Sequence, residues 1–152
     1  MTTSFDFSKP VAIGADHAGF EYKEKIVGLL SSRNIAFKDF GTYNADSTDY
    51  PDFAHPVASA VENNEAACGI LVCGSGNGVA ITANKHKGIR AALCWELELA
   101  KLAREHNNAN IICLPQRFTQ IELVLKMIEM FLNTPFEGGR HERRVGKIAV
   151  GC

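Results

Sequence analysis

The stretch GILVCGSGNGVAITANK, residues 69–85, decides the fold class. It starts as an uninterrupted apolar run that ends in Cys73, and such a run is typical of a strand buried on both faces. Three glycines follow within five positions, and the alanine-rich segment after them has the composition of a helix. A buried strand, a glycine turn and a helix together predict one βα unit of a parallel sheet.

The same alternation of strand and helix patterns continues on both sides of this stretch. Strands are predicted at residues 10–16, 35–41, 68–73, 89–94 and 110–115. Helices are predicted at residues 19–34, from Pro51 or Asp52 to about 63, 77–88, 96–107 and 119–134. We expect the third helix to end at Gly88, and the fifth to open with a capping box of Thr119 and Glu122. Five successive βα units predict an α/β fold in which helices cover both faces of a five-stranded parallel sheet.

The length of 152 residues predicts one domain, residues 1–152. Residues 1–9 form an N-terminal extension ahead of the first strand, and residues 137–152 form a basic C-terminal helix or tail. At helical spacing, Arg140, Arg144 and Lys147 share one face. That face is either a solvated basic surface or a phosphate clamp, because the arginine fork matches phosphate oxygens.

Charge and cysteine content exclude several classes of protein. The formal net charge of −1 provides no overall attraction to nucleic acid or to a membrane surface, and no apolar run is long enough to span a bilayer. The N-terminus, MTTSFDFSKP, lacks the basic start and apolar core of a signal peptide, so we expect a cytoplasmic protein. An odd number of cysteines, five, without a secretion signal predicts free thiols in a reducing compartment. Since the sequence contains no C-x-x-C pair, we expect neither a zinc site nor a thioredoxin-type site.

Polar and reactive residues follow the predicted strands, where ligands of such sheets bind. Asp16 and His17 follow the first strand, Cys73 the third and Arg117 the fifth. A helix N-terminus favours the thiolate form of a nearby cysteine, and a glycine loop lets a ligand approach the backbone. The alternatives are a buried structural cysteine, a capping aspartate and a surface histidine. His106 and Asn107 instead follow a helix, and they need a special loop to reach the same edge.

Common anion-binding motifs do not fit the glycine loop. The dinucleotide fingerprint needs a glycine where this chain has Val79, and the sequence contains no P-loop motif. A cysteine-phosphatase loop needs an arginine at that same position. The loop is therefore predicted to hold an anionic ligand of another kind.

Several segments in order resemble the type B ribose-5-phosphate isomerase family, which also contains galactose-6-phosphate and allose-6-phosphate isomerases. They are GADHAGF (14–20), TDYPDFA (48–54), CGSGNGVAITANKHKGIRAAL (73–93), REHNNANIICL (104–114) and EGGRHERRV (137–145). The resemblance implies a Rossmann-like three-layer αβα sandwich that interconverts an aldose phosphate and a ketose phosphate without metal or organic cofactor. It also implies a homodimer or homotetramer with active sites at the subunit boundary.

The resemblance assigns roles to individual residues. Cys73 corresponds to the base that moves a proton between C2 and C1, with Ser75 supporting it. His106, helped by Asp16, corresponds to the acid/base that opens the sugar ring. Backbone N–H groups for the enediolate oxygen are implied at Gly74, Gly76, Asn77 and Gly78, with help from Asn107. Phosphate contacts are implied at His17, Arg117, Arg140 and Arg144, the last two from a neighbouring subunit, and Tyr50 is implied to line the sugar pocket.

The sequence leaves some alternatives open. A hexose-6-phosphate isomerase of the same family and a non-catalytic nucleotide- or flavin-binding module are the other candidate functions. The choice between dimer and tetramer is open as well. We expect the remaining thiols to be packing or inert surface groups, namely Cys68, Cys94, Cys113 and Cys152.

Overall fold

The computed structural model describes residues 5–151, and its centre is a five-stranded parallel sheet in the order β2-β1-β3-β5-β4. The strands are β1 (Val11–Ala15), β2 (Phe37–Asp39), β3 (Cys68–Cys73), β4 (Ala91–Leu93) and β5 (Ile111–Pro115). Every residue of β1, β3 and β5 is buried, as expected for strands covered on both faces. The predicted parallel sheet is confirmed.

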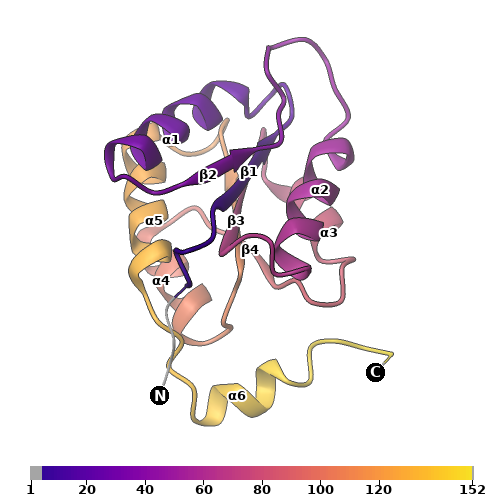
Figure 1. Cartoon of the computed structure of the whole chain (residues 1–152), viewed down its shortest axis with the longest axis vertical. Helices are drawn as coiled ribbons and strands as arrows, with labels where there is room; N and C mark the ends of the chain where they lie inside the picture. Colours follow the sequence, from indigo (N-terminus) through magenta and orange to yellow (C-terminus); the bar gives the residue numbers. More distant parts are fainter. Residues whose placement is uncertain (1–4, 152) are drawn as a thin grey trace.

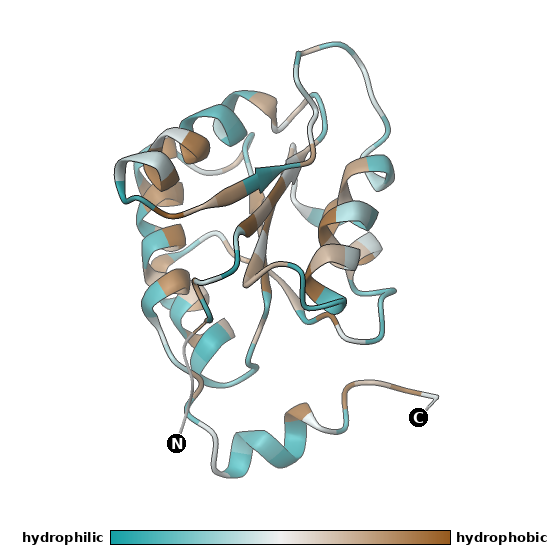
Figure 2. Cartoon of the chain, in the orientation of Figure 1, coloured by the Kyte–Doolittle hydropathy of each residue, from teal (hydrophilic) through white to brown (hydrophobic). Residues whose placement is uncertain are grey.

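Helices cover the two faces of this sheet (Figure 1). They are α1 (Phe20–Ser32), α2 (Pro51–Glu62), α3 (Asn77–Ala83), α4 (Leu97–Glu105), α5 (Ile121–Asn133) and α6 (Arg140–Val145). On one face α1, α4 and α5 pack over Ile70 and Val72, and on the other α2 and α3 pack over Leu71 and Cys73. Apolar side chains of the helices therefore face the sheet, as the brown segments of Figure 2 show. The three-layer αβα sandwich is confirmed.

The end of α3 and the cap of α5 differ from the prediction, and helices α1, α2 and α4 begin and end within about two residues of it. Helix α3 ends at Ala83 instead of Gly88, because the Asn84 side chain accepts from the N–H of Ala91 and donates to its carbonyl, at 2.8 and 2.9 Å. The predicted capping box of α5 is wrong. Gln120 is the residue before the helix, no side chain caps it, and the buried Thr119 hydroxyl has no hydrogen-bond partner among the described residues.

Helix α6 follows the extended segment 134–139 and lies at one end of the molecule (Figure 1). It ends at Val145, so Lys147 does not continue the helical face of Arg140 and Arg144. The basic segment thus contains a short helix, which is shorter than the spacing indicated.

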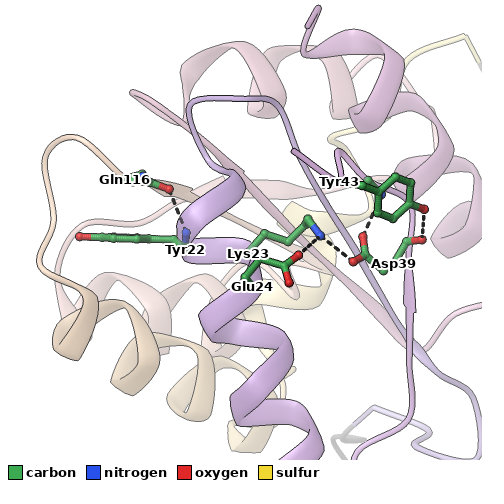
Figure 3. A network of polar contacts seen from close by, with 7 residues as sticks. Tyr22, Lys23, Glu24, Asp39, Tyr43 and Gln116 are labelled. Atoms are coloured by element: carbon green, nitrogen blue, oxygen red, sulfur yellow. Dashed lines mark hydrogen bonds and ion pairs between the residues drawn. The ribbon is translucent and has the colours of Figure 1, made fainter. Parts of the chain in front are cut away.

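A buried ion pair connects α1 to the end of β2 (Figure 3). The Lys23 side chain is fully buried, and its Nζ lies 2.5 Å from Asp39 Oδ2 and 2.9 Å from Glu24 Oε1. Asp39 also accepts from the N–H of Gly41 at 2.8 Å, and its carbonyl accepts from the Tyr43 hydroxyl at 2.9 Å. These contacts fix the start of the loop that leads to α2.

The four cysteines in the described part of the chain are free thiols. Burial raises the pKa of Cys68 and of Cys94 to about 12, and raises that of Cys113 well above its ordinary value. These three thiols are therefore inert packing groups, as predicted, while Cys152 lies outside the described residues. Within residues 5–151, no helix is both long and apolar enough to cross a membrane.

Candidate active site

A cavity of about 440 Å³ opens at the carboxyl edge of the sheet. It lies at the ends of β1 and β3, where the chain leaves neighbouring strands in opposite directions, as ligand sites of such sheets do. The predicted site residues that line it are Asp16, His17, Tyr50, Cys73, Gly74, Ser75, Gly78 and Arg117. The structure thus brings together the four residues that the strand ends singled out.

The glycine loop provides a backbone donor to the Cys73 thiol. Cys73 is only 5% exposed, and its sulfur accepts a hydrogen bond from the N–H of Gly76 at 3.1 Å. The N–H of Asn77 donates to the Ser75 hydroxyl at 3.2 Å. Gly76 has a φ of +77°, a left-handed conformation that favours glycine. The turn therefore directs one backbone N–H at the thiol and another at the Ser75 hydroxyl.

Two other glycines of the loop allow side chains to approach closely. A Cβ on Gly78 would lie 2.8 Å from the Tyr50 ring, and a Cβ on Gly74 would lie 3.2 Å from Arg117 Nη1. The Tyr50 ring and the Arg117 guanidinium thus lie directly against the backbone next to Cys73. The arrangement places a guanidinium from one segment and a phenol from another against the glycine loop that follows the Cys73 thiol.

Asp16 and His17 are held in place by local hydrogen bonds. Asp16 Oδ1 accepts from the N–H groups of Ala18 and Gly19 at 3.0 and 3.1 Å, so this carboxylate does cap the turn before α1. The backbone N–H of His17 donates to Thr48 Oγ1, and the backbone N–H of Thr48 donates to His17 Nδ1, both at 3.1 Å. Because Nδ1 is an acceptor, the proton of the neutral ring is on Nε2, which makes Nε2 a donor.

Gly76 and Asn77 belong to the glycine loop at this same carboxyl edge, at the start of α3. The other four predicted residues, His106, Asn107, Arg140 and Arg144, lie at the opposite edge of the sheet. His106 and Asn107 precede β5, whose five residues at about 3.3 Å each separate them from the carboxyl edge. Asn107 lines a different cavity of about 380 Å³, together with Ile148. The expected loop that would bring His106 and Asn107 to the Cys73 edge is therefore absent from the described chain, and within one chain Asp16 does not meet His106.

His106 is surrounded by residues of the C-terminal segment. Its Nε2 lies 3.6 Å from Glu137 Oε2, and its ring stacks on that of His141 with centroids 4.2 Å apart and planes 10° apart. His141 is 5% exposed, and burial, then the neighbouring His106, lowers its pKa. Arg140 and Arg144 follow on α6. Acid–base, aromatic and cationic groups thus gather in a second cluster, at the edge opposite Cys73.

His106, Glu137 and His141 are also the group in the described chain that could hold a metal ion, with ligand atoms within 4.8 Å of one another. The imidazole rings of His106 and His141 are nearly parallel, so the nitrogen lone pairs of the two rings lie in parallel planes. These lone pairs do not point to one metal ion unless a ring rotates. The positive charges of Arg140 and Arg144 nearby also disfavour a cation. The cluster suits acid–base chemistry better than metal binding.

Sequence reasoning missed three residues of these clusters, Thr48, Glu137 and His141. All three stand inside the quoted segments TDYPDFA and EGGRHERRV. Their contacts with His17 and His106 join positions about 30 residues apart in the chain, so local sequence patterns do not reveal them. The signal that could have identified these three residues is their position inside the quoted segments.

The chain is similar in sequence and structure to known isomerases. The model of the ribose/galactose isomerase family matches residues 11–148. Ribose-5-phosphate isomerase B of Escherichia coli (strain K12) is 43% identical over 142 residues, which cover 93% of this chain and 95% of that protein. A crystal structure of a ribose 5-phosphate isomerase from Thermotoga maritima matches with a TM-score of 0.91 at 51% identity, covering 93% of this chain and 97% of the other.

Ribose-5-phosphate isomerase B from Mycoplasma genitalium, solved with bound ribulose-5-phosphate, has a TM-score of 0.89 at 43% identity. The match covers 94% of this chain and 95% of that one. The aligned lengths include both the cavity at the carboxyl edge and the His106 cluster. The chain belongs to the ribose/galactose isomerase family.

Proposed function

We propose that this protein is a ribose-5-phosphate isomerase, which interconverts D-ribose 5-phosphate and D-ribulose 5-phosphate through an enediolate in the pentose phosphate pathway. The observation that carries the proposal is the Cys73 thiol, which accepts a hydrogen bond from the Gly76 N–H and lines a cavity together with Arg117 and His17. The relatives reported above are named for ribose 5-phosphate, which favours a pentose over a hexose substrate.

The reaction removes a weakly acidic proton beside a carbonyl, so it needs a base at that carbon and donors at the developing oxyanion. Cys73 takes the C2 proton and returns it to C1, and Ser75 supports the thiol. Backbone N–H groups of the loop at Gly74, Gly76, Asn77 and Gly78 stabilise the enediolate oxygen. A base and a set of donors contribute on the order of 10² to 10⁴ each in rate.

The phosphate provides binding energy away from the reacting carbon, which helps to position that carbon. Arg117 and the Nε2–H of His17 serve as donors to the phosphate, and Tyr50 packs against the sugar. The proposed chemistry uses only protein side chains and backbone, with neither metal nor organic cofactor. We place the enzyme in the cytoplasm, as one domain of residues 1–152 with an extension at 1–9 and a tail at 137–152.

Ring opening requires His106, which lies at the edge opposite Cys73 in its own chain. We therefore propose a homodimer or homotetramer in which a neighbouring copy supplies His106, Asn107, Arg140 and Arg144 to each cavity. Asp16 of one copy then assists His106 of the other. This arrangement accounts for two chemically complementary clusters that a single chain holds apart.

The direct test measures formation of ribulose 5-phosphate from D-ribose 5-phosphate by the purified protein in the presence of EDTA. Cys73→Ala is expected to abolish activity, whereas the control Cys113→Ala, at a buried cysteine outside the cavity, keeps it. In D₂O, NMR is expected to show deuterium at C1 of the product, the mark of proton transfer through an enediolate. Unchanged kcat in Cys73→Ala would contradict the assignment of the base.

The shared site is tested by mixing inactive subunits. Equal amounts of Cys73→Ala and Arg140→Ala chains are expected to regain about one quarter of wild-type activity, since half of the dimers are mixed and one of their two sites is intact. No recovery despite subunit exchange would mean that both residues act within one chain.

The substrate is tested by comparing sugar phosphates. Faster turnover of allose 6-phosphate or galactose 6-phosphate would identify a hexose phosphate instead of a pentose phosphate as the substrate. No turnover of any of them, together with a bound chromophore, would favour the nucleotide- or flavin-binding alternative.

A further inference from the structure

Arg104, in the last turn of α4, is a fully enclosed cation that the proposed mechanism does not use. It is only 1% exposed. Its Nη1 donates to Asn108 Oδ1 at 3.0 Å and to the carbonyl of Ala109, and its Nε donates to the carbonyl of Thr134 at 3.1 Å. Among residues 5–151, no carboxylate forms an ion pair with it, so carbonyl and amide oxygens satisfy the charge.

The groups that accept these bonds belong to the two segments that hold the second cluster. Asn108 and Ala109 form the turn directly after His106 and Asn107, and Asn108 has a φ of +46°. Thr134 is the first residue after α5, where the chain begins its path toward Arg140. One guanidinium therefore ties together the turn with the ring-opening histidine and the segment with the phosphate-binding arginines.

Aromatic rings close the space around Arg104. Its guanidinium carbon lies 4.0 Å from the centroid of Phe5 and 5.7 Å from that of Phe131, and the two rings are 5.4 Å apart. Phe5 is the first described residue of the chain, and its ring covers the guanidinium. Contacts of a planar cation with ring faces are favourable.

A folded protein is often as stable or more stable with an apolar side chain at a buried position than with a charged one. Stability alone therefore does not explain an arginine at this position. The fork of the guanidinium reaches carbonyls in different directions, whereas the single ammonium of a lysine does not reproduce that geometry. What the arginine adds is a set of hydrogen bonds that holds the 108–109 turn and Thr134 at a fixed separation.

We propose that Arg104 is a positioning residue, which holds the His106–Asn107 turn and the 134–139 segment in the relative placement that a neighbouring cavity requires. The proposal rests on the proposed function, because it assigns Arg104 to the half of the site that one copy donates to another. Loss of Arg104 leaves the Cys73 half of the same chain intact. A misplacement of catalytic groups by about 1 Å costs on the order of 100-fold in rate.

The first experiment compares Arg104→Met with Arg33→Met. Arg33 is an exposed arginine paired with Glu129 away from both clusters, so it controls for the loss of an arginine. We expect Arg104→Met to lower kcat by about 10- to 100-fold, and Arg33→Met to stay within about twofold of the wild type. Arg104→Lys keeps the charge without the fork, and we expect a loss close to that of Arg104→Met.

Mixing of subunits then separates a local defect from a general one. Arg104→Met chains mixed with Cys73→Ala chains are expected to regain about one quarter of wild-type activity, because one site of each mixed dimer is intact. Mixed with His106→Asn chains they are expected to regain none, because both defects lie in the same half. A purely structural role would damage both halves of the Arg104→Met chain and prevent the first recovery.

Cys73→Ala mixed with His106→Asn is the reference pair. Failure of that pair would refute the shared site of the proposed function, and Arg104 would then be judged by its kcat against Arg33→Met. Wild-type kcat in Arg104→Met, or recovery with His106→Asn, would overturn the proposal. If Arg104→Met does not fold, Asn108→Gly takes its place, since it keeps the positive φ and removes one acceptor of Arg104. We expect a smaller loss with the same mixing pattern, and an unchanged kcat would overturn the proposal.

Discussion

Replacement of Gly76 by alanine tests the geometry of the loop beside Cys73. At φ +77° an alanine costs about 1–2 kcal/mol. An ideal Cβ there would also lie 2.3 Å from Leu93 Cδ1, and displacing this partly buried side chain costs about 1–3 kcal/mol more. We therefore expect Gly76→Ala to lower the free energy of unfolding by about 2–5 kcal/mol. Since the Gly76 N–H donates to the Cys73 sulfur, kcat is expected to fall as well.

The assay is urea denaturation, with Gly28→Ala as the matched control. Gly28 lies inside α1, and a Cβ there meets nothing within 4 Å, so alanine is expected to stabilise by about 1 kcal/mol. The double variant Gly76→Ala/Leu93→Ala, compared with Leu93→Ala alone, retains only the cost of the positive φ, about 1–2 kcal/mol. A loss below about 1 kcal/mol in Gly76→Ala would refute the reasoning.

Three further predictions concern the titratable groups. In a Cys152→Ser background, brief alkylation near pH 8 is expected to modify Cys73 alone, because burial keeps the other three described cysteines protonated. A second adduct in the mass spectrum would contradict this prediction. Burial lowers the pKa of His141 from 6.5, so as the pH falls the unfolded chain binds this proton before the folded chain does. We therefore expect the free energy of unfolding, measured in urea, to decrease as the pH falls below about 6.5, and to decrease more in the wild type than in His141→Gln. The His17 bond to Thr48 leaves Nε2 as the donor, so His17→Gln is expected to keep a lower KM than His17→Asn, and the reverse order would refute that tautomer.

The sequence predicted the elements whose limits depend on local pattern. Strand β3 begins and ends at the predicted residues, because its apolar run is bounded by a polar segment and by glycines. The end of α3 could not be predicted in this way, since Asn84 bonds to Ala91 on another element. Lys23 and Arg104 were also missed, because charged residues are expected at the surface and their partners lie on other elements.

The candidate site shows the same division. Strand ends located the cavity that contains Cys73 and Arg117, because parallel strands bring their carboxyl ends to one edge. The place of His106 could not be derived by that rule, since the residue follows a helix and lies at the other edge. The joining of the two edges in one site is an expectation that came from the resemblance alone, and it belongs to the proposed oligomer.

The residues that line the cavity at the carboxyl edge include arginine and histidine, and the described ones include no lysine. An open-chain aldose phosphate carries a free aldehyde, which condenses with the neutral amine of a lysine to form an imine. A guanidinium such as that of Arg117 does not enter that reaction readily. The described lining of this pocket therefore offers a guanidinium and an imidazole but no primary amine, so an open-chain sugar phosphate in the proposed site meets no amine with which to form an imine.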